Sequence, residues 1–549
     1  MTQVPGAESG ALGGNLGDDV GNDLGDVLDR TLPDASAEMV VALLRHLFTA
    51  KEYDQGLALV DQWWEAHSTN ANFLKIARSL QVKRGEMTAT LRTTQRLIAL
   101  KQASQDATTL IEGRLRELTG QVPVLPGPAE TVVPFNPHRV LHLVKESRPY
   151  LSNGFTSRSH YNFLAEREAG LDPIVVTEPG FPRSVVGDAA RPQVNPDGIR
   201  HFHLDVGPAD FKAMPVDRYL QLFADLALER VRFLRPAIIH VSSGRRGYET
   251  ALVALAIKDR TGIPVVYEVR SFFEANWTDE VRYEASGEQF ESRMRLEEEC
   301  MHRADFVLTL GESMRSEIVA RGIPAEKVGI IPNGVDVERF TPRERPQELA
   351  DELGIGDAPT FGYVSNMDHY RESQETLIAA CAALKAAGRD EHCLLVGGGP
   401  RREMLEALAE SLDVADRVHF TGNVDHDRVV DYYALIDVFV VPRTRERAAT
   451  HVTPLKPFEA MALGIPVVVS DLPALVELTD PPHRGWKFEP DDAGDLARVI
   501  TEVFDDPAER SRRVSAATEW IHTQRQWVHN GPRYREYFEH VLGRGELPR

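Results

Sequence analysis

The sequence THVTPLKPFEAMALGIPVVVSDLPALVE runs from Thr450 to Glu477 and carries the signals of a loop, a helix and a buried strand. Thr453 is suited to cap the amino end of the helix, because its side-chain oxygen can accept a hydrogen bond from a free N–H group. Pro454 suits the first helical position, where a missing N–H costs nothing. We therefore expect a helix that includes Phe458 to Leu463 and ends at Gly464.

Apolar strands are predicted on both sides of this helix. Asp437–Pro442 and Ile465–Val469 are nearly continuous apolar runs, so the order is strand, loop, helix, strand. In such a unit the helix begins at the carboxyl end of a strand, where open α/β sheets bind phosphates and nucleotides. Lys456 on the first turn would add a positive charge. Glu459, one turn further along, could accept two hydrogen bonds from a ribose, although the helix dipole alone would also favour an acidic residue there.

The run EAMALGIPVVVSD, from Glu459 to Asp471, resembles the nucleotide-sugar site of retaining glycosyltransferases with the two-domain GT-B fold. The resemblance is to glycosyltransferase family 4, also called group 1, whose signature is Glu-x7-Glu. Glu459 matches the second Glu, whereas His451 occupies the position of the first. In the family, the second Glu holds the donor ribose and the first faces the donor sugar. The resemblance therefore implies donor binding at Glu459 and makes His451 a candidate to face the sugar.

Strands and helices alternate over most of the chain after a proline-rich connector, 122–137. This alternation predicts parallel sheets that are covered by helices on both faces. Together with the resemblance, it predicts an α/β GT-B fold, in which two Rossmann-like domains face a cleft and follow an N-terminal α-helical extension. The expected parts are a disordered segment (1–36), an N-terminal helical region (37–122), an N-terminal Rossmann-like acceptor domain (137–335), a C-terminal Rossmann-like nucleotide-sugar domain (336–506) and C-terminal helices that cross back to the first domain (507–549).

The N-terminal part of the chain lies outside the resemblance. Residues 1–36 are rich in Gly and Asp and carry too few apolar residues to offset the entropy of the chain. Apolar residues between 37 and 118 recur with helical spacing. Trp63 and Trp64 could anchor a partner or a second copy of the chain, but such aromatic residues more often pack a hairpin onto its own domain. We favour packing and leave open a partner or an oligomer through these helices.

The composition limits the kinds of partner and compartment. The 549 residues imply two or three domains, and the net charge of −21 argues against nucleic acid as a general partner. Cys300, Cys381 and Cys393 are too few and too scattered for a disulfide framework or a zinc site. The sequence has no signal-peptide pattern and no apolar run long enough to span a bilayer. We expect a cytoplasmic protein, and the composition is compatible with peripheral membrane contact.

Two candidate residues lie in the first Rossmann-like domain. Gly154 belongs to the predicted loop 145–156 after the first strand, where the family has a glycine that touches donor phosphate or acceptor; a plain turn is the alternative. His240, at the end of the strand Ala237–Val241, and Glu268-Val269-Arg270, at the end of another strand, are expected to face the cleft. Family members often carry a second polar residue or His after the strand-end His, and Ser242 takes that place here. A histidine that is buried in the core is at least as plausible for His240 as a catalytic one.

The second Rossmann-like domain supplies the other donor-site candidates. Many family members carry Gly-Arg after its first strand and a Lys five residues later, and both cations grip the donor diphosphate. Here Asn366 replaces the Arg and Arg371 replaces the Lys, so one cation is kept. A guanidinium can bind phosphate through two hydrogen bonds, although an Arg on a solvated turn is the alternative. Gly398 lies in a tight turn, expected near the nucleotide base, that is not a dinucleotide fingerprint.

The triplet Asp425-His426-Asp427 resembles the metal-binding Asp-x-Asp of GT-A enzymes. It falls between a predicted strand and a predicted helix, so Asp425 is better interpreted as a helix cap. We therefore expect neither a metal nor any other cofactor in the reaction.

These features predict a retaining, metal-independent hexosyltransferase. It would move a sugar from a nucleotide-diphospho-sugar to an acceptor hydroxyl, in cell-envelope polysaccharide or glycolipid synthesis. The charge of the leaving diphosphate would be carried by Arg371, by Lys456 and by the helix start at Thr453, Pro454 and Leu455. Two alternatives remain: a degenerate GT-B binding or scaffold protein, and a nucleotide-sugar epimerase. The sequence names neither the base, the sugar nor the acceptor.

Overall fold

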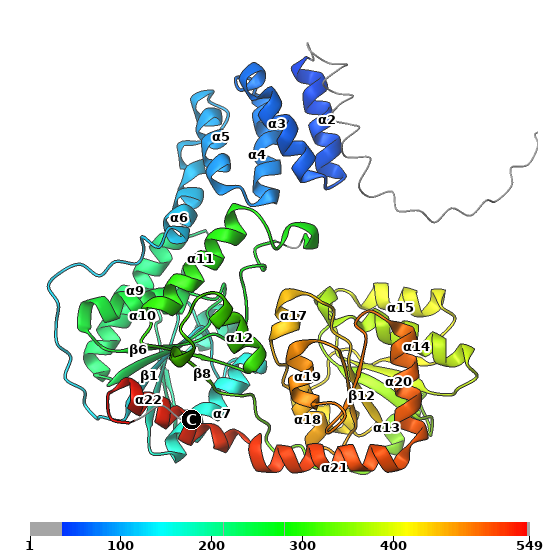
Figure 1. The fold of residues 1–549 in the computed structure, drawn as a ribbon. Helices are drawn as coiled ribbons and strands as arrows, with labels where there is room; N and C mark the ends of the chain where they lie inside the picture. The colour runs from blue at the N-terminus through cyan, green and yellow to red at the C-terminus, as the bar shows by residue number, and fades with distance from the viewer. Residues whose placement is uncertain (1–35, 212, 279, 546–549) are drawn as a thin grey trace, which may run out of the picture. The chain divides into compact units, whose positions relative to one another are not determined.

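The computed structural model describes residues 36–211, 213–278 and 280–545 (Figure 1). The predicted disordered segment, 1–36, therefore lies outside the described residues except for Ser36. The chain divides into two compact units, Met1–Ile111 and Glu112–Arg549.

The first unit is an array of antiparallel helices. Its members are α2 (Ala37–Thr49), α3 (Tyr53–His67), α4 (Ala71–Arg84), α5 (Met87–Ala99) and the start of α6 (Thr109–Leu118). Gly56 lets α3 approach α4, because a Cβ there would lie 2.8 Å from a methyl carbon of Leu80. Trp64 packs on Phe73 with ring centroids 6.3 Å apart, and Trp63 stacks on His67. Both tryptophans thus contact rings of their own unit, which fits the packing role that we favoured.

The first part of the second unit is built on an eight-stranded sheet. The strand order is β3-β4-β2-β1-β5-β6-β7-β8, and all pairs are parallel except the short edge pair of β3 with β4. The strands are β1 (Arg139–Val144), β2 (Asp172–Thr177), β3 (Gln193–Val194), β4 (Arg200–His203), β5 (Ile238–Ser242), β6 (Val265–Glu268), β7 (Phe306–Thr309) and β8 (Val328–Ile330). The helices are α7 (Gly154–Glu168), α8 (Arg183–Val186), α9 (Val216–Leu234), α10 (Glu249–Thr261), α11 (Glu288–Arg303) and α12 (Glu312–Ala320).

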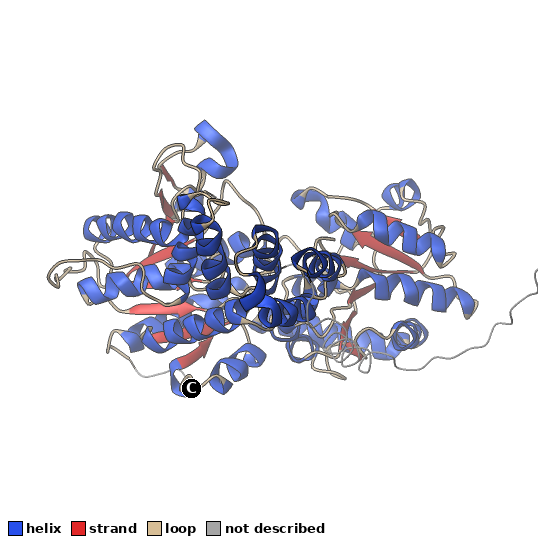
Figure 2. Ribbon diagram, turned by 90° about the horizontal axis from the view of Figure 1, so that it is seen from above, coloured by secondary structure: helices blue, strands red, loops and turns tan. Residues whose placement is uncertain are grey.

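The second sheet has six parallel strands in the order β11-β10-β9-β12-β13-β14. They are β9 (Thr360–Val364), β10 (His392–Val396), β11 (Val418–Phe420), β12 (Val438–Val441), β13 (Val467–Ser470) and β14 (Trp486–Phe488). The helices are α13 (Gln347–Glu352), α14 (Gln374–Ala386), α15 (Arg402–Ser411), α16 (Val429–Tyr433), α17 (Arg447–His451), α18 (Lys456–Ala462), α19 (Pro473–Thr479) and α20 (Ala493–Asp505). Figure 2 shows helices on both faces of each sheet. The predicted α/β fold with two Rossmann-like sheets is confirmed.

The end of the chain returns to the first sheet. After α21 (Pro507–Gln524), helix α22 (Asn530–Val541) lies beside α7 (Figure 1). Tyr534 and Phe538 pack into an apolar cluster with residues of β1, β5 and β6. Gly531 permits the close approach of the two helices, because a Cβ there would lie 2.1 Å from the backbone oxygen of Ala165. Within the described ranges, none of the helices combines the length and the apolar character needed to cross a membrane.

Candidate functional site

The N-cap of α18 is not the residue that the sequence predicted. Helix α17, which the sequence did not predict, ends at His451, and α18 begins at Lys456 with Leu455 as its N-cap. Thr453 is therefore not the cap, and Pro454 is not the first helical residue. Thr453 instead turns its backbone oxygen and its Oγ1 towards the Nδ2 of Asn333. Because α18 has only seven residues, we expect the side chains, more than the helix dipole, to supply the positive charge at its N-terminus.

Glu459 lies one turn into α18 and is held by a tyrosine from α16. The hydroxyl of Tyr433 donates a hydrogen bond of 2.7 Å to Oε2 of Glu459. Burial raises the pKa of Glu459, and the Tyr433 bond and the nearby Lys456 partly oppose that shift. The carboxyl group is thus fixed in orientation at the start of the helix.

Lys456 lies between two carboxylates, Glu459 and Glu372. Burial lowers the pKa of Lys456, whereas both carboxylates raise it. Arg443, two residues after β12, binds Glu372 with NH2 3.1 Å from Oε1 and Nε 3.3 Å from Oε2. Although burial opposes ionisation, Arg443 and Lys456 lower the pKa of Glu372 to about 2. The carboxyl ends of β9 and β12 therefore carry a cluster of four titratable side chains, Arg443, Glu372, Lys456 and Glu459, in which Arg443 and Glu372 form an ion pair.

Arg371 belongs to the same cluster. It lies in a short 3-10 turn, Tyr370–Glu372, with its Nε 3.7 Å from Oε1 of Glu372. Asn366 is exposed at the end of β9, and its backbone oxygen accepts a hydrogen bond from Gln374. Gly398 lies on the adjacent turn after β10, where its backbone oxygen accepts a bond from Met367 N. Asn366 and Gly398 thus mark neighbouring turns at the carboxyl edge of the sheet.

Gly154 is the first residue of α7 and not a loop residue, which corrects the predicted loop 145–156. Asn153 caps the helix, because its side chain accepts from Thr156 N and its own N–H is bonded to the Thr156 hydroxyl. A Cβ on Gly154 would lie 3.4 Å from Leu455 Cδ1. Two predicted donor-site residues, Gly154 of the first sheet's domain and Leu455 of the second's, are therefore neighbours.

His451 is bound by the first sheet's domain. Its Nδ1 lies 3.1 Å from the hydroxyl oxygen of Ser313, and its ring packs edge-on against Phe272. Burial lowers the pKa of His451, which favours the neutral imidazole. The side chain at the first Glu position thus forms an interdomain contact.

More interdomain contacts surround His451. The carboxylate of Glu477 on α19 accepts hydrogen bonds from the N–H groups of Glu312, at 2.9 Å, and of Ser313, at 3.1 Å. Arg447 on α17 donates to Glu274 at 2.9 Å and also pairs with Glu317. Helices α17 and α19 are therefore tied to α12 and to the loop after β6.

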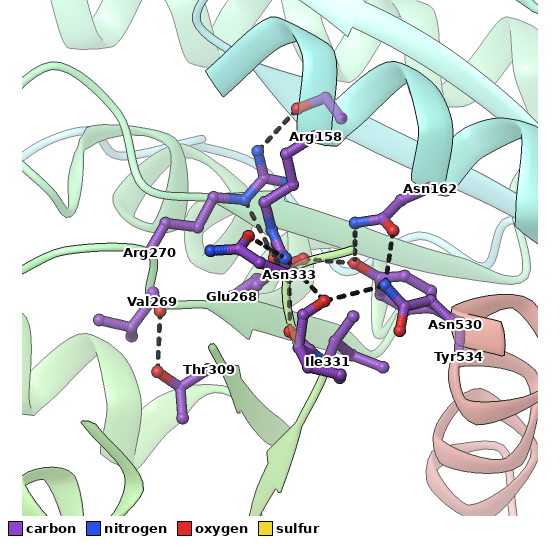
Figure 3. A network of polar contacts seen from close by, with 12 residues as sticks. Arg158, Asn162, Glu268, Val269, Arg270, Thr309, Ile331, Asn333, Asn530 and Tyr534 are labelled. Atoms are coloured by element: carbon purple, nitrogen blue, oxygen red, sulfur yellow. Dashed lines mark hydrogen bonds and ion pairs between the residues drawn. The ribbon is translucent and has the colours of Figure 1, made fainter. Parts of the chain in front are cut away.

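The expected position of His240 is wrong, because its ring lies beneath α22 and does not face the cleft. Its Nδ1 is 2.9 Å from Nδ1 of His142, and its Nε2 is 3.1 Å from Oε2 of Glu268. The ring of Tyr534 covers it at 5.6 Å. Burial lowers the pKa of His240, so the ring is favoured in its neutral form. His240 belongs to a buried polar network, part of which Figure 3 shows, and not to the cluster around Lys456.

Known families match both halves of this arrangement. The family model described as "Glycosyl transferases group 1" matches residues 345–520, and the family model described as "Glycosyl transferase 4-like domain" matches residues 161–334. The chain belongs to the group 1 glycosyltransferases, glycosyltransferase family 4.

Two relatives show how similar this family 4 chain is to other members of the family. It is 30% identical over 226 residues to a GDP-mannose-dependent alpha-(1-6)-phosphatidylinositol monomannoside mannosyltransferase of Mycobacterium tuberculosis. That match covers 41% of this chain and 58% of the relative, so the chain spans little more than half the length of that relative. Glycogen synthase of the same organism is 25% identical over 412 residues, which cover 71% of this chain and 91% of the relative.

Solved structures share the fold of this family 4 chain. Sucrose-phosphate synthase from Thermosynechococcus elongatus superimposes with a TM-score of 0.61 at 20% identity, covering 74% of this chain and 99% of that one. An Anabaena protein in complex with UDP and glucose, Alr3699/HepE, superimposes with a TM-score of 0.56 at 17% identity, covering 73% and 100%. The likeness establishes the GT-B fold.

Three residues of the candidate site were not predicted from the sequence: Arg443, Glu372 and Tyr433. One signal was available, because Arg443 lies two residues after the buried strand Val438–Val441, at the carboxyl edge where α/β sheets bind ligands. The hydrogen bond from Tyr433 to Glu459 spans 26 positions, and no local pattern announces it.

Proposed function

We propose that the chain is a retaining, metal-independent glycosyltransferase. It moves a sugar from a nucleotide-diphospho-sugar to an acceptor hydroxyl, in the synthesis of a cell-envelope polysaccharide or glycolipid. One observation carries the proposal: Lys456 and the oriented carboxyl of Glu459 lie together at the start of α18, beside Arg371. This set offers cations for a diphosphate and an acceptor for ribose hydroxyls.

The chain's own side chains fit the steps of transfer. As the acceptor oxygen bonds to the anomeric carbon, the bond from that carbon to the diphosphate breaks and negative charge grows on the leaving oxygens. Lys456 and Arg371 would stabilise this charge, and such preorganised electrostatics usually dominates catalysis. A donor phosphate oxygen would take the acceptor proton on the same face, so no protein nucleophile is needed.

Glu459 would hold the nucleoside. The Tyr433 hydroxyl fixes its Oε2, which leaves Oε1 to meet a ribose hydroxyl. An acceptor that is already fixed loses little conformational entropy when the ligand binds. Lys456 is half-buried, so its attraction for a diphosphate is less weakened by water than that of an exposed lysine.

The degenerate GT-B binding protein is the second candidate. His451 has no carboxylate to turn to the donor sugar, and its ring is bonded to Ser313 instead. Asn366 likewise lacks the charge of the family's Arg. A protein of this kind would bind a nucleotide or a glycan without turning over the donor.

Calorimetric titration with UDP, GDP, ADP and TDP tests the proposal on the wild-type protein and on Glu459→Ala and Arg371→Ala. Hydrogen bonds to charged groups contribute about 1.5–3 kcal/mol, so each variant should weaken nucleotide binding roughly 10- to 100-fold. Arg428→Ala, which removes an exposed guanidinium at the start of α16, is the matched control. Loss of binding in the first two variants, with the control unchanged, supports the site.

Three other outcomes decide between the candidates. If none of the four nucleotides binds the wild-type protein, the transferase proposal fails. If one binds but its nucleotide sugars are never consumed with any acceptor, the binding protein replaces the enzyme. Conversion of the donor to an isomer without release of diphosphate would instead identify an epimerase.

A further inference from the structure

The interdomain linker, residues 331–335, is held by a buried arginine whose hydrogen-bonding capacity is full. Arg158 on α7 has five N–H donors, and the structure supplies five acceptor contacts for them. Nε and NH2 donate to Oε1 of Glu268 at 3.1 and 2.7 Å. NH2 also reaches Ile331 O at 2.7 Å. NH1 donates to Pro332 O at 3.0 Å and to Oδ1 of Asn333 at 2.8 Å (Figure 3).

This arginine fixes the orientation of the Asn333 amide. A guanidinium only donates hydrogen bonds, so the atom of Asn333 that faces Arg158 must be the oxygen. The NH2 group of the same amide then points away, and it donates to Thr453 O at 2.8 Å and to Thr453 Oγ1 at 3.2 Å. Asn333 and Thr453 are both nearly fully buried, so water does not compete for these bonds.

Thr453 lies in the donor loop, which we define as residues 452–455, directly before Lys456. Two successive carbonyl groups of this loop are held from different parts of the fold. Arg443 NH1 donates to Val452 O at 3.2 Å from within the second sheet's domain. Asn333 holds the next carbonyl from the linker. The Asn333 amide is therefore the contact that ties the backbone of the donor loop itself to the linker, in addition to the interdomain contacts of His451, Arg447 and Glu477.

We propose that Asn333 is a positioning residue that sets the donor loop against the first sheet's domain. Its amide joins the Arg158–Glu268 pair to the backbone of Thr453. This inference rests on the proposed function, because a donor loop matters only if a donor binds there. The proposed role explains why this position holds an asparagine. Its side chain must accept a hydrogen bond from Arg158 and donate one to Thr453 O, and an amide can do both.

The test separates positioning from general support of the linker. Asn333→Ala removes both contacts. Asn333→Asp keeps an acceptor for Arg158 but sets an oxygen against Thr453 O. Asn530→Ala is the matched control, because the Asn530 amide is equally buried and donates to Pro332 O of the same linker at 3.0 Å without touching the donor loop.

Two readouts are used on the full chain. The first is calorimetric affinity for the nucleoside diphosphate that the wild type selects from UDP, GDP, ADP and TDP. The second is amide hydrogen exchange in peptides covering 452–463. We expect Asn333→Ala and Asn333→Asp to weaken nucleotide binding at least fivefold and to raise exchange at 452–463. Asn530→Ala should bind nucleotide within twofold of the wild type and leave exchange at 452–463 unchanged.

The proposal is overturned if Asn333→Ala and Asn530→Ala change affinity and exchange alike, or if Asn333→Asp matches the wild type. If the wild-type protein binds no nucleotide, the proposed function fails, and hydrogen exchange still decides the inference. Raised exchange at 452–463 in the Asn333 variants alone would uphold the contact to the donor loop. Unchanged exchange at 452–463 in the Asn333 variants would refute that contact.

Discussion

Replacing Glu268 with glutamine should destabilise the first sheet's domain strongly. Oε1 of Glu268 accepts from Arg158 and, at 3.0 Å, from Nε of Arg270, and Oε2 accepts from the Tyr534 hydroxyl at 2.8 Å. Glu268 is fully buried and both arginines are nearly so. Glutamine keeps the shape but removes the negative charge, which leaves two buried cations without their counterion. Breaking a buried ion pair in this way costs about 3–5 kcal/mol.

Thermal unfolding at pH 7 measures this loss. For a domain of this size each kcal/mol lowers the midpoint by about 2–4 °C, so the expected fall is roughly 6–20 °C. Although burial opposes ionisation, Arg270 and Arg158 hold the pKa of Glu268 well below its ordinary value near 4.5. A depressed pKa stabilises the fold fully above the unfolded value and less as the pH falls below it. The difference in thermal midpoint between the wild type and Glu268→Gln should therefore shrink only below about pH 4.5.

Glu297→Gln is the matched control, because Glu297 is an equally buried carboxyl on α11 with a different charge. Burial raises its pKa to about 8, so the group is largely protonated at pH 7, and glutamine replaces it with another neutral group. A raised carboxyl pKa costs stability as the pH rises from about 4.5 towards 8, by roughly 1.4 kcal/mol per unit. Glu297→Gln should change the midpoint little below about pH 4.5, where the carboxyl is neutral in both states, and should flatten the fall of the midpoint between about pH 4.5 and 8.

Equal midpoints for the two variants at pH 7 would refute this reasoning. So would a midpoint of Glu268→Gln within about 2 °C of the wild type, since about 1 kcal/mol is less than a broken buried pair costs.

Two further substitutions test how the parts of the second unit are joined. Arg447→Ala removes a cation that pairs across the two domains, so it should increase the radius of gyration in small-angle X-ray scattering. Arg445→Ala is the control, because the partner of Arg445 lies in its own domain, and it should leave the radius of gyration unchanged. Equal scattering from the two variants would contradict the interdomain contact of Arg447. Gly531→Ala places a methyl group 2.1 Å from Ala165 O and should lower the thermal midpoint by several degrees, whereas Gly494→Ala, with 3.3 Å to the nearest atom, should leave it nearly unchanged. An unchanged midpoint for Gly531→Ala would show that α22 is not tightly docked.

Local patterns in the sequence predicted parallel α/β sheets, and the family resemblance added the two-domain GT-B arrangement. Apolar runs such as Val438–Val441 report a strand that is buried on both faces, and the intervening helical periods report parallel connections. The EAMALG run placed Glu459 and Lys456 at the start of one helix, as the structure has them. The same reasoning put the helix start too early, because the unpredicted helix α17 uses residues up to His451 and Thr453 is engaged by Asn333.

Most strands and helices could thus be predicted from the sequence alone, and so could the charged residues in the first turn of α18. Only the tertiary structure decided that Glu459 meets Tyr433, that His240 lies beneath α22 and that Asn333 holds Thr453. The physical reason is separation along the chain. Periodicity reports burial and short-range bonding, whereas the Asn333 to Thr453 bond joins residues 120 positions apart, and its partners are fixed only when the two sheets and the C-terminal helix pack together.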